Sequence, residues 1–256
     1  MTAELWAGLE SDELEIHLQS EVWLEDGSHF GYEAQPRWTH PKGKTIDGPQ
    51  LLGQVENTAL ALPVARRLVE RACEELESRD HNRPDASVSI ALPALEDPRI
   101  AETVSAALAA TETRPGRLCL EVSARRPIES FDAARESWFE LHEAGVGFAL
   151  EGCGSETLPI GPLAVFPFDF VRLDASLIRA VSHSAQARRM VATIARAAAE
   201  REAITVADGI ETNTETIAAF ELGCRVAQGP RFGRPLPPRT GGRVDRTRPA
   251  AVPSYS

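Results

Sequence analysis

The chain of 256 residues lacks long apolar runs, net positive charge and closely spaced cysteines. No run approaches the roughly 18 consecutive apolar residues that span a membrane. The acidic N-terminus, M-T-A-E-L-W-A-G-L-E, has no apolar core of signal-peptide length. The formal net charge of −11 argues against binding to nucleic-acid backbones, which needs clustered positive charge. We therefore expect a soluble cytoplasmic protein that binds neither nucleic acid nor a membrane.

Cysteine and histidine are too scattered to form a familiar metal site. The four cysteines lie far apart with no C-x-x-C spacing, and the six histidines show no H-x-x-x-H spacing. This pattern is typical of reduced, buried thiols, and it argues against a zinc site. The turn G-C-G at 152–154 is not followed by G-K-[ST], so it is no phosphate-binding loop.

What the sequence does have is a regular alternation of strand and helix patterns. With 43% hydrophobic and 25% charged residues, the chain can bury a large core. The predicted strands cover 14–24, 29–34, 87–92, 117–122, 146–150, 170–173, 203–207 and 225–228. The predicted helices cover 60–76, 98–110, 131–143, 185–202 and 214–222. No internal repeat is visible.

This order predicts an α/β fold, a (β/α)₈ barrel of the TIM type. The hairpin turn at Asp26-Gly27 makes the first strand antiparallel to its neighbour, an unusual feature in such a barrel. We place the barrel at residues 13–238, after an N-terminal extension at 1–12. Residues 239–256 contain four arginines and few large apolar residues, which predicts a disordered tail that could contact a partner.

Carboxylates recur at the predicted strand ends, where barrels of this kind place their working residues. The strand-end residues in chain order are Glu33, Ala91, Glu121, Glu151, Asp174, Asp208 and Gln228. Converging carboxylates repel, so they need a cation, a proton or an arginine to neutralise them. Hard divalent ions such as Mg²⁺ take oxygen ligands of this kind. From spacing alone, a metal site and ordinary solvated strand ends both stay open.

Several short motifs, in order and over nearly the whole chain, resemble the EAL domain, the cyclic di-GMP phosphodiesterase family. Y-E-A-Q-P-R-W is similar to the family signature E-A-L-x-R-W. V-R-L-D stands where the family has I-K-[IL]-D, and A-D-G-I-E where it has A-E-G-[VI]-E. A-Q-G-P-R-F-G-R-P-L-P resembles A-Q-G-x-x-F-x-R-P-[LM]-P. The resemblance implies a modified eight-stranded barrel with an antiparallel first strand, in agreement with the hairpin.

The same resemblance implies a two-metal catalytic site of which only remnants are left. The retained site residues are Glu33, Glu121, Asp174, Asp208 (a shortened Glu) and Glu211. At three lost positions, Ala91 replaces the family's Asn, Gly152 replaces an Asp, and Arg172 replaces the catalytic Lys. Arginine is always protonated, so it cannot exchange a proton with water. Since Mg²⁺ tolerates little deviation from octahedral geometry, we expect no bound metal, no cofactor and no catalysis. Mg²⁺ is expected only if the site works after all.

The resemblance also names candidates for nucleotide contact, namely Gln19, Arg37, Gln228 and Phe232. Against binding, Gln35 replaces the family Leu that packs against the nucleotide. Two functions therefore remain. The first is a regulatory module with a protein partner of unknown identity, and the alternative is a non-hydrolysing receptor for cyclic di-GMP. Weak phosphodiesterase activity is a third reading, and a homodimer is left open.

One geometric expectation follows for the remnant site. Period-two alternation puts Arg172 and Asp174 on the same strand face, and a guanidinium can pair with two carboxylates at once. We expect Arg172 to take the position of the lost metal and to ion-pair with at least one of Glu33, Glu121 and Asp174.

Overall fold

The structure is a computed structural model that describes residues 13–39, 43, 45–55, 58–80, 87–91, 94–123, 131–154 and 166–238. The expected N-terminal extension at 1–12 and the Arg-rich tail at 239–256 lie outside the described residues. No helix in the described part of the chain combines the length and the apolar character needed to cross a membrane.

The described strands form one curled sheet in the order β1-β9-β8-β7-β6-β5-β4-β2-β3, closed by pairing of β1 with β2. The strands are β1 (Leu14–Trp23), β2 (His29–Thr39), β3 (Thr45–Asp47), β4 (Ser87–Ala91), β5 (Leu118–Ser123), β6 (Gly147–Cys153), β7 (Phe170–Leu173), β8 (Ile204–Ala207) and β9 (Val226–Gln228). β1 is antiparallel to both β2 and β9, whereas β2 and β4 through β9 pair in parallel. The expected barrel with an antiparallel first strand is therefore confirmed.

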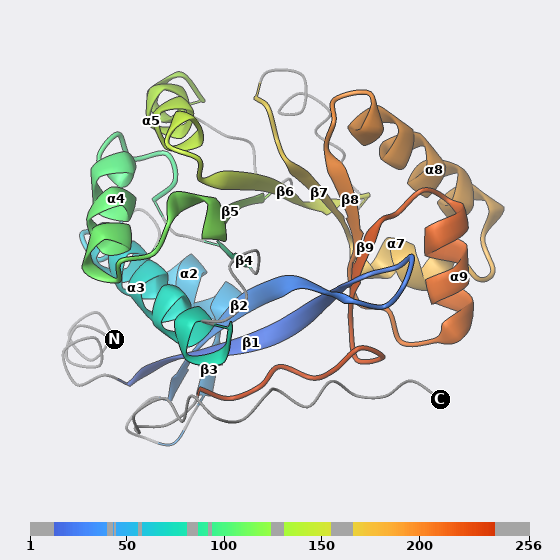
Figure 1. Cartoon of the computed structure of the whole chain (residues 1–256), viewed down its shortest axis with the longest axis horizontal. Helices are drawn as coiled ribbons and strands as arrows, with labels where there is room; N and C mark the ends of the chain where they lie inside the picture. The colour runs from blue at the N-terminus through green and yellow to red at the C-terminus, as the bar shows by residue number, and fades with distance from the viewer. Residues whose placement is uncertain are drawn as a thin grey trace.

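Helices lie around the outside of this sheet, with α3, α4, α5, α8 and α9 at the periphery (Figure 1). The helices are α2 (Gly48–Val55), α3 (Ala61–Asp80), α4 (Ile100–Ala110), α5 (Phe131–Glu143), α7 (Ala175–Ala180), α8 (Ala185–Ala199) and α9 (Asn213–Glu221), with a 3₁₀ turn, η1, at Pro115–Arg117. Side chains at their starts supply hydrogen bonds that helix ends otherwise lack. Ser184 caps α8, and Thr212 with Glu215 forms a capping box on α9.

The strand β2 is longer than the sequence predicts. It runs to Thr39, whereas the predicted strand ended at residue 34. Pro36 faces Ile16 of β1, while on the other side of β2 the pairing with β4 ends at Glu33 and that with β3 begins at Arg37. Because the strand has only one neighbour at this point, the missing N–H of proline is tolerated.

Three short elements, β3, α2 and α7, were not predicted from the sequence. Each has eight residues or fewer, too short for a clear periodic pattern. The helix α7 begins directly after β7, and the side chain of Asp174 accepts a hydrogen bond from the Ser176 backbone N at 2.8 Å.

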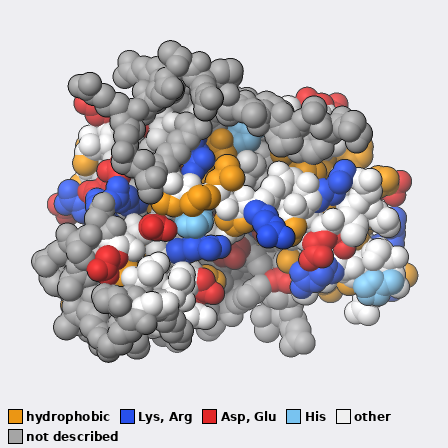
Figure 2. All heavy atoms as spheres, turned by 90° about the horizontal axis from the view of Figure 1, so that it is seen from below, with side chains coloured by type: hydrophobic (Ala, Val, Ile, Leu, Met, Phe, Trp, Pro, Cys, Tyr) orange, Lys and Arg blue, Asp and Glu red, His pale blue; other side chains and the backbone are white. Residues whose placement is uncertain are grey.

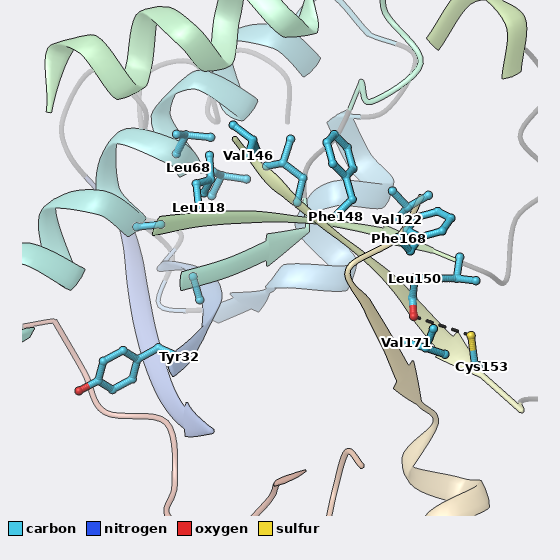
Figure 3. Close-up of a cluster of buried hydrophobic side chains, with 14 of the residues drawn as sticks. Tyr32, Leu68, Leu118, Val122, Val146, Phe148, Leu150, Cys153, Phe168 and Val171 are labelled. Carbon is cyan, nitrogen blue, oxygen red and sulfur yellow. Dashed lines mark hydrogen bonds between the residues drawn. The ribbon is translucent and has the colours of Figure 1, made fainter. Parts of the chain in front are cut away.

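The core fills the space between the sheet and the surrounding helices. Figure 3 shows side chains of β5, β6 and β7 gathered there, among them Leu118, Phe148 and Val171. Phe166 and Phe168 are both buried, and their rings lie 5.3 Å apart in an edge-on arrangement, whereas Phe170 is half-buried. All four cysteines are free and buried, as their spacing predicted.

Candidate functional site

Three strands bring polar side chains together at one end of the barrel. β1 carries Gln19 and Glu21 two residues apart, so both point to the same face of the sheet. Gln19 lies opposite Glu33 of β2, and Glu21 lies opposite Gln228 of β9. Gln19, Glu21 and Gln228 are buried, whereas Glu33 is not fully buried. Buried polar groups need hydrogen-bond partners within the protein, so the partners of these side chains matter for stability.

The guanidinium of Arg172, on β7, lies at the centre of this group and is 2% exposed. Its Nε and Nη2 donate to the two carboxylate oxygens of Asp208, at 3.2 and 2.8 Å. Its Nη1 donates to Glu21, and its Nη2 also donates to Gln228 Oε1 at 2.5 Å. Glu121 Oε1 lies 3.5 Å from Nη1. Arg172 thus ion-pairs with Glu121, one of the three expected carboxylates, whereas the carboxylates to which it donates hydrogen bonds are those of Asp208 and Glu21.

Burial and like charge shift the pKa values of this cluster. Burial works against the charged form of Arg172, yet Asp208, Glu21, Glu121 and Glu33 together raise its pKa well above the usual value. Burial raises the pKa of Asp208 to about 7, although Arg172 acts to lower it. The cluster therefore holds a permanent positive charge, and Asp208 takes up a proton near neutral pH.

Glu121, on β5, has an oxygen that lacks a hydrogen-bond donor among the described residues. The atom is Oε1, and it is fully buried. Burial raises the pKa of Glu121 well above its usual value, with Arg172 opposing and the neighbouring carboxylates adding to the shift. The residue in register with Glu121 on β4 is Ala91, whose side chain has no polar atom to offer.

A ring of amides surrounds Glu33 at the end of the barrel. Gln35 Nε2 donates to Gln19 Oε1 at 2.9 Å and to Glu33 Oε2 at 2.8 Å. Gln228 Nε2 donates to the same two oxygens, at 2.9 Å to Gln19. Gln19 Nε2 in turn donates to the backbone oxygen of Gly233 at 2.9 Å. We call Gln19, Glu33, Gln35 and Gln228 the amide ring.

Other expected site residues occupy different surroundings. Asp174 is buried and caps α7, where its side chain also accepts from the Ser176 hydroxyl at 2.5 Å. The side chain of Glu211 is exposed just before α9. Gly152 has a φ of +78°, a conformation that favours glycine, next to a register shift between β6 and β7. Gly152 thus lies in an irregular part of β6 and offers no side-chain oxygen.

The other two nucleotide-contact candidates, Arg37 and Phe232, are close in sequence to members of the amide ring. Arg37, on β2, is half-buried, and its guanidinium has no hydrogen bond or ion pair within the described residues. Phe232 follows β9, is half-buried against the core, and has the guanidinium of Arg231 5.9 Å from its ring centre.

Two residues of the site were missed as candidates. Glu21 carried a usable signal, since it follows Gln19 by two positions on an alternating strand and so shares its face. Gln35 has the same relation to Glu33 on β2, but its amide was judged only as the loss of an apolar nucleotide contact. For both residues, the usable signal in the sequence is strand alternation, which places them on the same face as a neighbouring site residue.

The residues present do not fit a pair of divalent ions. Glu33 Oε2 already accepts two amide hydrogen bonds, and the Arg172 guanidinium lies against Glu21, Asp208 and Glu121. A cation at the carboxylates would meet this fixed positive charge at close range. Within the described ranges, no group of three or more Asp, Glu, His or Cys side chains is arranged to hold a metal ion.

Solved structures share this barrel closely. The chain is 27% identical to the structure titled "PaMucR Phosphodiesterase, c-di-GMP complex", with a TM-score of 0.82 over 92% of this chain and 97% of that one. The FimX EAL domain from Pseudomonas aeruginosa, in a structure titled as bound to c-di-GMP, matches with a TM-score of 0.81 at 18% identity over 92% and 96% of the chains. At that identity the second match shows the fold alone.

Sequence comparison agrees with the structures. The Pseudomonas aeruginosa protein named bifunctional diguanylate cyclase/cyclic di-GMP phosphodiesterase MucR is 27% identical over 237 residues, which are 91% of this chain. This chain spans only 35% of the length of MucR. The EAL domain family itself matches residues 2–235. With this barrel, its antiparallel first strand and its strand-end residues, the chain belongs to the EAL domain family.

Proposed function

We propose that this chain is a non-hydrolysing EAL domain that acts in cyclic di-GMP signalling as a regulatory module for a protein partner. The proposal rests on Arg172, whose buried guanidinium pairs with the carboxylates at the end of the barrel. Arg172 supplies one positive charge within the chain, and burial raises the pKa of Glu121 and Asp208, so the repulsion among these carboxylates is reduced without a metal ion.

Hydrolysis by two metal ions requires chemistry that this cluster lacks. The ions lower the pKa of the attacking water and stabilise the leaving oxygen. Arg172 can do neither in their place, since it stays protonated and its guanidinium donates to Asp208, Glu21 and Gln228. Ala91 and Gly152 supply no side-chain oxygen. We infer that the carboxylates serve to bind Arg172 and so to hold the barrel together.

A partner surface is supported by the outer face of α9. Ile217 and Phe220 lie one turn apart on this helix and are 59% and 39% exposed. Exposed large apolar side chains grouped in this way are typical of interaction sites. On the face seen from below, Figure 2 shows positive, negative and hydrophobic side chains interspersed.

A second candidate function, a receptor that binds cyclic di-GMP without cleaving it, is favoured by Arg37. This guanidinium is half-buried at the same end of β2 as Glu33 and Gln35, and it has no hydrogen-bonding or ionic partner in the described part of the chain. An arginine of this kind suits a phosphate group, because its planar fork binds phosphate oxygens in pairs.

Hydrolysis is tested directly by incubating the purified chain with cyclic di-GMP and Mg²⁺ or Mn²⁺ and separating the linear product by chromatography. We expect no product, with the PaMucR phosphodiesterase domain as the positive control. Ala91→Asn alone should stay inactive, because Gly152 and Arg172 remain. Turnover in the common enzyme range of roughly 1 to 10³ per second would overturn the proposal.

A further inference from the structure

The amide ring has one member, Gln35, that could leave it without breaking the rest. Gln35 is half-buried and gives both of its Nε2 hydrogens to ring members, one to Gln19 and one to Glu33. Gln228 donates to the same two oxygens from the opposite side. If Gln35 were removed, Gln19 and Glu33 would each keep one donor, so the barrel would still be hydrogen-bonded at this point.

Gln35 donates hydrogen bonds both to Gln19, a nucleotide-contact candidate, and to Glu33, a carboxylate of the remnant site. Gln19 is a nucleotide-contact candidate, and its oxygen accepts from Gln35 and Gln228 while its nitrogen donates to Gly233. Glu33 is a carboxylate of the remnant site, and its Oε2 also accepts hydrogen bonds from Gln35 and Gln228. A ligand that needs the Gln19 amide must first displace these hydrogen bonds within the protein.

We propose that Gln35 is a latch, a specificity-determining residue that keeps the β1–β2 end of the barrel closed to cyclic dinucleotides. The inference rests on the proposed non-hydrolysing function and explains how such a domain stays unresponsive to the nucleotide. The hydrogen bonds of Gln35 hold Gln19 and Glu33 to each other.

The expected change in affinity for cyclic di-GMP follows from the fraction of molecules in which the hydrogen bonds of Gln35 are broken and the amide ring is open. A ligand that binds only the open arrangement has its affinity reduced by the fraction of molecules that are open. The latch makes one neutral hydrogen bond and one to a carboxylate, and hydrogen bonds to charged groups are the stronger kind. Removing both should raise the affinity for cyclic di-GMP by at least about tenfold.

The test is a calorimetric titration of cyclic di-GMP into the wild-type chain and the Gln35→Leu variant, in buffer with EDTA so that no metal contributes. The matched control is Gln186→Leu, the same substitution at an exposed position of α8. We expect Gln35→Leu to bind at least about tenfold more tightly than the wild type, and Gln186→Leu to match the wild type.

Equal affinity of Gln35→Leu and the wild type would overturn the latch. Should the leucine variant fold poorly, Gln35→Met keeps an unbranched side chain of similar length without the amide, and the same gain is expected. The result is separate from the hydrolysis assay. Cleavage of the nucleotide by the wild type refutes the proposed function, whereas tight binding without cleavage that Gln35→Leu leaves unchanged refutes only the latch.

Discussion

The replacement Arg172→Met removes the one positive charge that the described structure places among Glu21, Glu121 and Asp208. The methionine fills much of the same space, so the loss is mainly electrostatic. Removing one partner of a buried ion pair typically costs about 3–5 kcal/mol, because it leaves an uncompensated buried charge. Asp208 loses two hydrogen bonds, and Glu21 and Gln228 lose one each. We therefore expect the free energy of unfolding to fall by about 3–5 kcal/mol at pH 7.5.

The assay is urea unfolding at pH 7.5 and at pH 5. With a slope of about 3 kcal/mol per M, the midpoint at pH 7.5 falls by roughly 1 to 2 M. The loss should be smaller at pH 5, where the freed carboxylates can take up protons. Arg66→Met serves as the control, since Arg66 is exposed and pairs with Glu70 on the surface of α3, and such pairs contribute about 0–1 kcal/mol. A loss below about 1 kcal/mol for Arg172→Met would refute the reasoning about the cluster.

Two further predictions concern the same cluster. Arg172→Lys keeps the charge but loses the fork to Asp208, so its unfolding free energy should lie between those of the wild type and Arg172→Met. The pKa of Asp208 is raised to about 7 in the folded chain from an ordinary value of 3.8, so the folded state holds more protons and its stability falls as pH rises from about 4 to about 7. Asp208→Asn removes this titration and should make the fall shallower, by up to about 1.4 kcal/mol per pH unit. Identical slopes in urea unfolding across that range would contradict the assignment.

The barrel and its odd first strand were predictable because they depend on strong local signals. The Asp26-Gly27 turn joins two alternating strands, and Gly27 has the positive φ of 72° that such a turn needs. The five longer helices α3, α4, α5, α8 and α9 were predicted to within a few residues of their observed ends, whereas the short α2 and α7 were not predicted. The path of β2 past Pro36 was not predictable, because it depends on which neighbouring strands are present at that point.

The site was only partly predictable for a similar reason. Of the residues expected at strand ends, Glu121, Asp208 and Gln228 contact Arg172, and Glu33 lies in the amide ring, since a parallel barrel brings such ends together. Their partners depend on distances across the barrel that no sequence pattern encodes. Asp174 caps its own helix, while Glu21, from the antiparallel strand, takes the place beside Arg172 that was expected of strand-end carboxylates. Which side chains meet inside a closed barrel depends on the register of the strands and the length of the side chains, and the register is set by the whole fold.

The central claim is that Arg172 supplies the positive charge that a metal ion would otherwise bring to the barrel end. The most direct measurement is a titration of the purified chain with Mn²⁺, in which electron paramagnetic resonance measures the free ion. The variants Glu33→Gln and Arg172→Met are titrated in the same way. The account predicts that the wild type leaves the free Mn²⁺ signal unchanged, as Glu33→Gln also does. Stoichiometric loss of that signal with the wild type, abolished by Glu33→Gln, would contradict it.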